Sequence, residues 1–463
     1  MSFWSLAGDP DAPALIAGAP PDAITYADLR YACDQFNAVL GERKQKRLGF
    51  LLCRNDVQSV AAYLGALRAG DCLALLPETI ADGALDALLE RYRPDWLLGP
   101  EERLHERAGS NWQGKRVVLC DSDARPIHVD LALLLSTSGT TGSPRMVRLS
   151  YANLAANAAS IAEYLALGSA ERPITTLPMH YSYGLSVINS HLHVGAALLL
   201  TDDAVTTRPF WNLFRDGGVT SLAGVPFTWQ MLARLRIERM DLPTLRTLTQ
   251  AGGRLSPELT EHFRQAADAH GWRFFVMYGQ TEATARIAYL PPDLLASKIG
   301  AIGQAIPGGA LSIADDGELL YRGPNVMLGY AESRDDLALG DTLHGVLRTG
   351  DLARQDEDGV YWLTGRIKRI AKVFGNRVNL DEVEALIATQ LGCAAAALDE
   401  DDALRVVLTQ PAREGEVLEI LRNTLGVHPS GLRVCSLDVL PRTSTGKLDY
   451  PALRERLKAA RHG

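Results

Sequence analysis

Along the first part of the chain, stretches in which apolar residues recur at helical spacing alternate with short continuous apolar runs. The spacing predicts helices over 26–40 and 57–69, and short apolar runs predict strands over 48–53 and 73–76. Further short apolar runs predict strands over 96–98, 117–120 and 131–135. Strands that alternate with helices are typical of parallel sheets. The sequence therefore predicts an α/β fold.

The apolar run 131–135 leads directly into a loop rich in glycines and hydroxyls. Gly139 and Gly142 would let backbone N–H groups converge at the end of a buried strand. Hydroxyl side chains would add donors that suit phosphate oxygens; those of interest are Thr137, Ser138, Thr140 and Thr141. The loop lacks the G-x-x-x-x-G-K-[ST] spacing, and its nearest cation is Arg145. Because such loops are often only solvated turns, the loop alone leaves a phosphate site and a plain turn open.

A helix is expected after this loop. Ser150 can cap it, and the apolar positions Leu154, Ala158, Ile161 and Leu165 would fall on one face. A helix that begins beside a phosphate loop would add its N-terminal dipole to the site.

A second strand and turn carry another group of candidate residues. The apolar run ending at Tyr278 is followed by Gly279, Gln, Thr281 and Glu282. Tyr278 offers a flat face on which a planar ring can stack, and Thr281 can donate to a phosphate. Glu282 is a hard-oxygen ligand suited to Mg²⁺. Thr-Glu-Ala-Thr also resembles a helix start, where Glu282 would stabilise the dipole, and the two roles are compatible.

Composition narrows the class of protein. The 463 residues are 47% hydrophobic, enough for a large core and more than one domain. The net charge of −8 gives no broad positive field for nucleic acid. Six scattered cysteines without a C-x-x-C pair suit a reducing cytoplasm, and no secretory signal or run long enough to span a bilayer is visible. We therefore expect a cytoplasmic globular protein.

Five motifs in a fixed order resemble the AMP-forming acyl-activating, or adenylate-forming, enzymes. They are Thr137-Ser-Gly-Thr-Thr-Gly-Ser-Pro-Arg145, Tyr278-Gly-Gln-Thr-Glu282, Arg348-Thr-Gly-Asp351, Gly365-Arg366 and Pro441-Arg-Thr-Ser-Thr-Gly-Lys447. The superfamily includes acyl-CoA synthetases and stand-alone adenylation enzymes. The resemblance covers essentially the whole chain.

The resemblance implies a fold and a reaction. The fold is a large N-terminal domain of α/β sheet units, residues 1–366, followed by a small mobile α+β domain, residues 367–463. In the small domain the pattern predicts strands over 404–408 and 432–440 and a helix over 414–425. The reaction consumes ATP with Mg²⁺ to give acyl-AMP and pyrophosphate. A thiol of CoA or of a carrier protein's phosphopantetheinyl arm then attacks the acyl group.

The resemblance also assigns roles to residues. Lys447 would be the catalytic cation, Thr281 and Glu282 would act at the phosphates and Mg²⁺, and Arg145 would stabilise pyrophosphate. Asp351, read as a strand-end carboxylate, and Arg366 would hold the ribose. Lys368 takes the hinge position, where a lysine hints at thioester formation, and Gly375 belongs to the thiol tunnel. The expected nucleotide contacts also include Thr137, Ser138, Gly139, Thr140, Thr141, Gly142, Gly252, Gly253, Tyr278 and Gly279.

The acid pocket is expected around a turn that carries aromatic residues and a histidine. The turn comprises His180, Tyr181, Ser182, Tyr183 and Gly184. A lone histidine is more often a hydrogen-bonded core residue, which remains the alternative. Amino-acid-activating relatives usually carry Asp where Gly184 stands, and a buried ammonium without a carboxylate is costly. The sequence therefore favours an aryl or acyl acid without an α-amino group.

Three other functions stay open. The acyl group of acyl-AMP could pass to an amine or a hydroxyl instead of a thiol. A non-catalytic nucleotide- or acyl-binding regulator would be expected to lack Glu282 or Lys447, and both are present. Ser444 and Lys447 also fit the S-x-x-K of serine acyl enzymes, but the S-D-N and K-T-G companions are missing.

Overall fold

The structure is a computed structural model that divides into two compact units. The first comprises Met1–Leu311 and Tyr321–Leu347, and the second comprises Ser312–Leu320 and Arg348–Gly463. The predicted boundary after Arg366 falls inside the second unit, and the division there stays a prediction. The residues that the structure describes are 2–18, 20–42, 45–120, 125–136, 145–373, 376–400, 403–425, 429–443 and 447–459.

A large mixed sheet forms one half of the first unit. Its parallel centre runs from β14 through β13, β12 and β10 to β11 and β1, and antiparallel strands flank it. In spatial order the strands of the described chain are β16 (Gln304–Ala305), β15 (Ala288–Leu290), β14 (Arg273–Tyr278), β13 (Thr247–Gln250), β12 (Ser221–Gly224), β10 (Pro173–Ile174), β11 (Leu198–Leu199), β1 (Pro13–Ala17) and β2 (Asp22–Thr25).

A second mixed sheet forms the other half of this unit. Strands β8, β4, β3 and β5 are parallel at its centre. In order the described strands are β19 (Gly329–Ala331), β9 (Met146–Ser150), β8 (Leu131–Ser136), β4 (Cys72–Pro77), β3 (Leu48–Cys53), β5 (Trp96–Pro100), β7 (Lys115–Leu119) and β6 (Ser110–Trp112).

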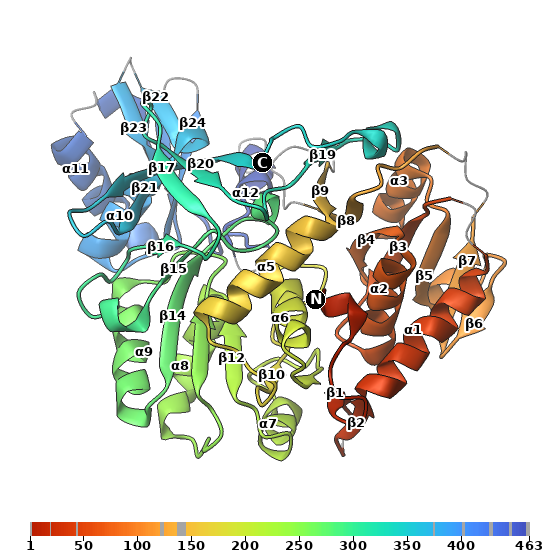
Figure 1. Cartoon of the computed structure of the whole chain (residues 1–463). Helices are drawn as coiled ribbons and strands as arrows, with labels where there is room; N and C mark the ends of the chain where they lie inside the picture. Colours follow the sequence, from red (N-terminus) through yellow and green to blue (C-terminus); the bar gives the residue numbers. More distant parts are fainter. Residues whose placement is uncertain are drawn as a thin grey trace. The chain divides into compact units, whose positions relative to one another are not determined.

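Helices pack on both faces of these sheets. Helices α1, α2, α5 and α6 share one apolar core with strands of both sheets, and Figure 1 shows α5 and α6 between the two sheets. Helix α3 covers the other face of β3, whereas α8 and α9 cover the outer face of β14. The helices are α1 (Tyr26–Leu40), α2 (Val57–Ala69), α3 (Asp82–Tyr92), α4 (Glu101–Leu104), α5 (Tyr151–Tyr164), α6 (Ser182–His193), α7 (Arg208–Asp216), α8 (Pro226–Leu235) and α9 (Pro257–His270).

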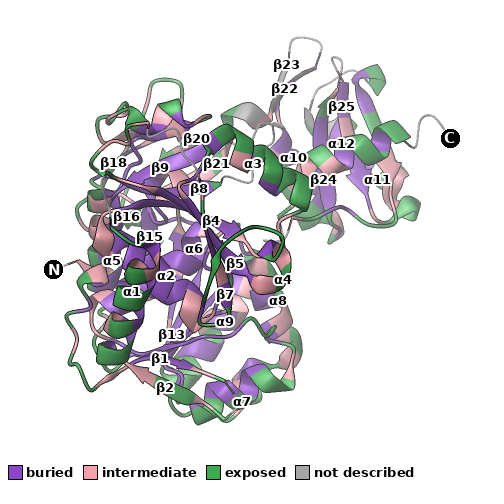
Figure 2. Ribbon diagram, turned by 90° about the vertical axis from the view of Figure 1, so that its right-hand side faces the viewer, coloured by how far each residue is buried: buried purple, intermediate pink, exposed green. Residues whose placement is uncertain are grey.

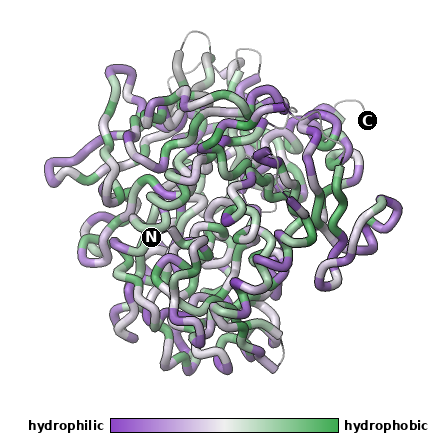
Figure 3. Tube along the Cα trace, turned by 45° about the vertical axis from the view of Figure 1, so that its right-hand side comes forward, coloured by the Kyte–Doolittle hydropathy of each residue, from purple (hydrophilic) through white to green (hydrophobic). Residues whose placement is uncertain are grey.

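The predicted α/β elements of the first unit are confirmed where the pattern was strongest. Strands in the centre of each sheet are buried, whereas the outer faces of helices such as α1 are exposed (Figure 2). Hydrophobic stretches of the chain lie mostly in the interior, and hydrophilic residues gather at the outer turns (Figure 3). In the described parts of the chain, no helix combines the length and apolar character needed to cross a membrane.

The second unit has its own apolar core. Helices α10 (Leu380–Leu391) and α11 (Glu414–Leu425) pack against a three-stranded sheet. That sheet contains β24 (Ala395–Glu400), β25 (Ala403–Leu408) and β26 (Leu432–Ser436), and α12 (Tyr450–Ala459) packs beside it. Strands β22 (Ile370–Val373) and β23 (Asn376–Asn379) form a hairpin. A further sheet has the order β17 (Ala310–Ile313), β18 (Glu318–Arg322), β20 (Val346–Gln355) and β21 (Tyr361–Arg366).

One expectation about the loop after β8 is wrong. The chain does not enter a helix after this loop but returns as β9, which pairs antiparallel with β8. Ser150 does cap α5, and its hydroxyl accepts from the backbone N–H of Asn153 at 3.0 Å. However, Ser150 lies opposite Leu131, at the end of β8 remote from the loop. The helix dipole therefore begins roughly 16 Å from the loop, because each strand residue advances the chain by about 3.3 Å.

Candidate functional site

The turn after β14 positions Thr281 and Glu282. A helix start was expected here, but the chain makes only the short 3₁₀ turn η3 (Thr281–Ala283). Thr284 then adopts φ +65°, a strained conformation for a β-branched residue that ends the turn. Asn325 holds the segment, because its amide donates to the carbonyls of Ala283 and Arg286 at 2.8 Å each. The role of Glu282 at a helix dipole is therefore excluded.

Gly279 is needed at this turn for a packing reason. A Cβ atom at position 279 would overlap the backbone carbonyl of Ala285. The two ends of the turn therefore pack backbone against backbone, which a residue with a side chain would prevent. The resemblance assigned Gly279 to the nucleotide, and the close approach gives it an additional structural role.

Glu282 has a partner that the sequence did not reveal. The hydroxyl of Tyr330, on edge strand β19, donates to Glu282 Oε1 at 2.8 Å. The guanidinium of Arg145 lies over the Tyr330 ring, 3.8 Å from its centroid. Burial and the neighbouring Glu282 carboxylate raise the pKa of Tyr330, so its hydroxyl stays protonated and donates. Tyr330 thus orients a carboxylate and supports a cation at the same place.

The start of α6 brings the expected acid pocket to this turn. The hydroxyls of Ser182 and Thr281 are 3.1 Å apart. At the end of β13, a Cβ atom on Gly252 would lie 2.7 Å from the Tyr181 hydroxyl, and Gly252 has φ +82°. Gly253 follows against Pro226. Ser182 therefore meets Thr281, and the neighbouring Tyr181 meets Gly252.

Gly184 and Tyr183 show how tightly α6 is packed. A Cβ atom at Gly184 would overlap the carbonyl oxygen of Pro178, so a larger residue does not fit there without movement. Tyr183 is buried, and its hydroxyl donates to the carbonyl of Thr249 at 2.8 Å. Position 184 therefore lacks a carboxylate and also lacks the space to hold one without movement.

His180 is mostly buried in the loop before α6. Its Nδ1 atom is buried without a hydrogen-bond partner, and burial lowers the pKa of the ring. Asn55 fixes this loop, since its amide donates to the carbonyls of Leu177 and Thr201 and accepts from the N–H of Met179. A neutral imidazole at this place suits both a residue of the acid pocket and a buried core histidine, the two interpretations that the sequence left open.

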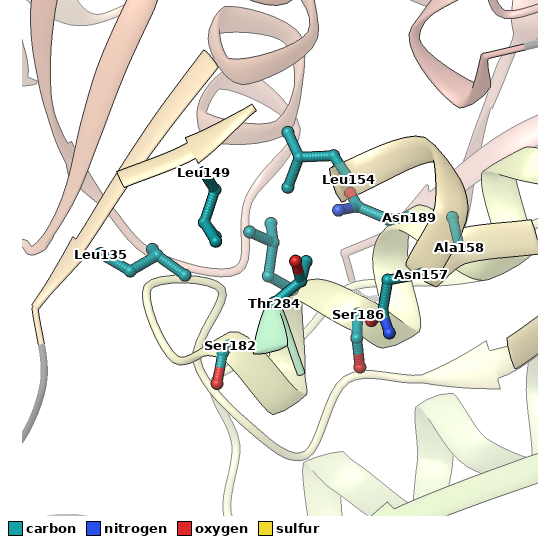
Figure 4. A pocket seen from close by; sticks show the side chains of 10 residues that line it. Leu135, Leu149, Leu154, Asn157, Ala158, Ser182, Ser186, Asn189 and Thr284 are labelled. Atoms are coloured by element: carbon teal, nitrogen blue, oxygen red, sulfur yellow. The ribbon is translucent and has the colours of Figure 1, made fainter. Parts of the chain in front are cut away.

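Two small cavities lie along α6. One, of about 10 Å³, is bordered by Ser182, Ser186 and Thr284 together with residues of β8, β9 and α5 (Figure 4). The other, of about 20 Å³, lies between α5, α6 and strands β12 and β13, and Arg286 borders it. Ser186 lines both.

Several predicted site residues lie outside the described residues. They are Thr137, Ser138, Gly139, Thr140, Thr141, Gly142 and Gly375, and also Ser444. The ends of the expected phosphate loop are described, because Ser136 closes β8 and Arg145 precedes β9. For Gly375, the flanking strands β22 and β23 pair as the expected hairpin.

Asp351 and Arg366 belong to the second unit. Asp351 lies inside the ten-residue strand β20 and not at a strand end, which corrects the expectation. It pairs with Arg366 across the sheet, and Arg366 Nε donates to its carboxylate at 2.9 Å. Asp351 is buried while Arg366 is exposed. The two residues therefore meet across β20 and β21, and their role in binding the ribose stays a prediction.

Lys447 lies at the base of a closed turn in the second unit. The N–H of Thr443 donates to the Lys447 carbonyl at 2.8 Å, and the N–H of Lys447 donates back to the Thr443 hydroxyl at 3.2 Å. Three residues later, Tyr450 stacks under the guanidinium of Arg369 at 4.1 Å. Lys368 precedes Arg369 in the short turn η6 (Ile367–Arg369), and its side chain is not described. The start of α12 (Tyr450–Ala459), just after Lys447, thus packs against the hinge segment.

The Glu282 carboxylate is an oxygen donor of the kind that suits magnesium. Among the described residues, no group of three His, Cys, Asp or Glu side chains could hold a metal ion. Mg²⁺ usually keeps several waters and binds one or two carboxylates together with substrate phosphates. Glu282, oriented by Tyr330, is a carboxylate of that kind.

Comparison with known proteins identifies the family. Residues 3–331 match the family described as AMP-binding enzyme. The chain is 32% identical over 349 residues to an indoleacetate–CoA ligase of Aromatoleum aromaticum, covering 70% of this chain and 66% of that protein. It is 28% identical over 483 residues to an L-proline–[L-prolyl-carrier protein] ligase of Pseudomonas fluorescens, covering 94% and 95% of the two chains.

Solved structures show the same fold. The o-succinylbenzoate CoA synthetase (MenE) of Bacillus subtilis, in complex with its acyl-adenylate intermediate, gives a TM-score of 0.80 at 22% identity and covers 99% of this chain and 98% of its own. Structures of that enzyme with AMP and with ATP and a magnesium ion match as well. The chain therefore belongs to the AMP-binding enzyme family, and it is an AMP-forming ligase that activates a carboxylic acid with ATP.

Proposed function

We propose that this protein is an acid–thiol ligase that works in two steps at the turn after β14. In the first step, a carboxylate oxygen attacks the α-phosphorus of ATP, and the bond to the β,γ-pyrophosphate breaks. In the second step, a thiol attacks the acyl carbon, and AMP leaves. The observation that carries the proposal is the contact of Glu282 with Tyr330 beside the Thr281–Ser182 pair.

The first step needs positive charge and donors, because two anions must approach each other. Thr281 would donate to the α-phosphate, and Arg145 would stabilise the departing pyrophosphate. Mg²⁺ held by Glu282 would neutralise phosphate charge. Lys447 would place its ammonium on both the attacking carboxylate and the α-phosphate, which favours the in-line approach. A flexible lysine on a turn suits a cation that is needed in one step only.

Other parts of the nucleotide would meet residues of known chemistry. Tyr278 would stack on the adenine. Asp351 and Arg366 would bind the ribose, since a carboxylate can accept from both ribose hydroxyls. The loop 137–142 and the glycines 252, 253 and 279 are proposed to lie along the phosphates and the acyl group.

The acceptor is proposed to be a thiol, either of CoA or of the phosphopantetheinyl arm of a carrier protein. One relative is named as a CoA ligase and another as a carrier-protein ligase, which supports both. The lysine at position 368 and the hairpin around Gly375 support thioester formation. All six cysteines are free, which supports the cytoplasm as the compartment.

An acid-dependent ATP–pyrophosphate exchange assay over aryl, short, medium and long acids and amino acids tests the first step. We expect exchange with at least one acid, and Lys447→Ala should abolish it while leaving thiolysis of preformed acyl-AMP largely intact. Equal loss of both half-reactions would contradict the role of Lys447. Product analysis with CoA, a carrier protein, amines and alcohols then identifies the acceptor, and absence of exchange with every acid would favour a non-catalytic nucleotide-binding protein.

A further inference from the structure

The lining of the larger cavity along α6 includes two buried nitrogen atoms without a hydrogen-bond partner, Arg286 Nε and His191 Nε2. The cavity occupies about 20 Å³ between α5, α6, β12 and β13. One water requires about 10–15 Å³, so a group of a few heavy atoms at most fits without movement. Its lining includes the side chains of Arg286 and His191 and several hydroxyl residues. A void meant only to be apolar would not carry such groups.

Arg286 is the first of these groups. Its side chain is 3% exposed, and the Nε atom is buried without a hydrogen-bond partner. Among the residues that the structure describes, no carboxylate lies within ion-pair distance of the guanidinium. Its neighbours are aromatic: the guanidinium lies 4.0 Å from the centroid of Tyr183, and it is hydrogen-bonded to the side chain of Tyr164. Burial raises the pKa of Tyr164 to about 12, so this phenol is neutral and is no counter-ion.

A buried guanidinium without an anion is costly to keep. Burying a charge is tolerated in proteins mainly where a partner of opposite sign or a set of acceptors compensates it. Arg148 shows the ordinary solution in this chain, since its guanidinium donates to the carbonyls of Tyr330, Leu328 and Gly340. Among the described residues, the Arg286 side chain has the neutral Tyr164 hydroxyl and the Tyr183 ring as partners but no carboxylate, so its charge suits an anion that these residues do not supply.

His191 is the second group. Its Nδ1 contacts the Val187 carbonyl at 2.8 Å, and because a carbonyl only accepts, Nδ1 carries the proton. Burial lowers the pKa of the ring to about 4, so the ring is neutral near pH 7. Its Nε2 is then an acceptor, which is buried at 4% exposure of the residue and has no partner. The cavity thus offers a donor cation and an acceptor.

Helix α6 runs from the Thr281 contact to this cavity. Ser182 contacts Thr281, and Ser186, one turn further along α6, lines both cavities. Figure 4 shows these two serines on the helix, with Thr284 near them. Arg286 also follows Glu282 by only four residues. An acid whose reacting carboxylate lies at Thr281 therefore extends toward Arg286.

We propose that this cavity binds the far end of the acid, and that Arg286 selects short acids with a second carboxylate. The inference rests on the proposed function, because it concerns the acid that the same site activates. The second carboxylate accepts from Arg286 Nε, and His191 Nε2 accepts from a hydroxyl or a water beside it. The small volume of the cavity admits only a compact group at the far end of the acid.

The test is ATP–pyrophosphate exchange with length-matched acids. Succinate is compared with butyrate and glutarate with pentanoate, and the ratio of kcat/KM within each pair is the readout. For the unchanged protein we expect the dicarboxylic acid to be preferred. Arg286→Met should lower the ratio by about 100-fold, since truncating one partner of a buried charge pair has an effect of that order. Arg286→Lys should give an intermediate ratio.

Arg273→Met is the matched control. Arg273 donates to the carbonyl of Leu165 and the hydroxyl of Thr247, two residues of the cavity wall, so its donors are already used. This variant should keep the ratio. If Arg286→Met unfolds below the assay temperature, the test uses Arg286→Lys instead. For that variant the proposal requires the ratio of kcat/KM, dicarboxylic over monocarboxylic acid, to fall at least tenfold below that of the unchanged protein.

The outcomes separate the two proposals. The selection by Arg286 is overturned if monocarboxylic acids support exchange at least as well as their dicarboxylic partners and the Arg286 variants leave the ratio unchanged. Acid activation itself would still stand in that case. Exchange with no acid at all would overturn the proposed function, and this inference with it.

Discussion

Removing the hydroxyl of Tyr330 should weaken the response of the enzyme to magnesium. The hydroxyl donates to Glu282 at 2.8 Å from the edge strand β19, and Glu282 is the carboxylate proposed to hold Mg²⁺. Tyr330→Phe keeps the ring under Arg145 but leaves one carboxylate oxygen without its donor. The carboxylate is then free to turn away from the ligand geometry.

The size of the effect follows from the type of contact. Loss of a hydrogen bond that orients a metal ligand typically lowers metal affinity by about 10–100-fold. Because a tenfold change corresponds to about 1.4 kcal/mol, the variant should lose about 1.4–2.8 kcal/mol of metal binding free energy. The assay is acid-dependent ATP–pyrophosphate exchange at fixed ATP over a range of Mg²⁺ concentrations, from which the half-saturating concentration is read.

Tyr92→Phe is the matched control for this variant. The Tyr92 hydroxyl is also buried, and it donates to the carbonyl of Ala331, the residue next to Tyr330. This control should lower the free energy of unfolding by about 1 kcal/mol, as for a typical hydrogen bond, with no change in half-saturating Mg²⁺. A Tyr330→Phe enzyme with an unchanged magnesium response would refute the role assigned to this contact.

Three further predictions concern packing and charge. Gly279→Ala should lower exchange activity by about 100-fold, because its Cβ would overlap the Ala285 carbonyl and displace the turn; activity close to that of the unchanged protein would contradict this. Ser150→Ala should lower the free energy of unfolding in urea by about 1 kcal/mol through loss of the helix cap, and a loss of activity without loss of stability would not fit. For His191, burial lowers the pKa to about 4 in the folded state, so the folded protein binds fewer protons than the unfolded one below pH 6.5. Its contribution to stability is complete above pH 6.5 and is lost as the pH falls toward 4, by about 2 kcal/mol between pH 7 and pH 5. His191→Asn, which keeps a donor for the Val187 carbonyl, should remove that part of the pH dependence of unfolding, and an unchanged pH profile would contradict the assignment.

The local pattern predicted the regular elements well. The bounds of α1, β3 and α2 agree with the expected ranges, because β3 is a continuous apolar run and each helix follows a capping residue, Thr25 or Asp56. The expectation failed where a strand lay between a loop and a capped helix. Met146–Ser150 is short and follows the loop directly, so the cap at Ser150 was recognised while the reversal of the chain was not.

Contacts between distant segments limited what the sequence could reveal about the site. Tyr330 lies 48 residues after Glu282, and neither its position on an edge strand nor its donor role has a local signal. Arg286 sits near an expected motif, but only burial and the lack of a described carboxylate partner single it out. The short turn at Thr281 likewise depends on Asn325, which holds it from another segment.

The most direct measurement is a crystal structure of the protein with ATP and Mg²⁺. We predict that the α-phosphate lies within hydrogen-bond distance of the Thr281 hydroxyl, that the metal contacts Glu282, and that the adenine stacks on Tyr278. Nucleotide bound away from these three side chains would contradict the account.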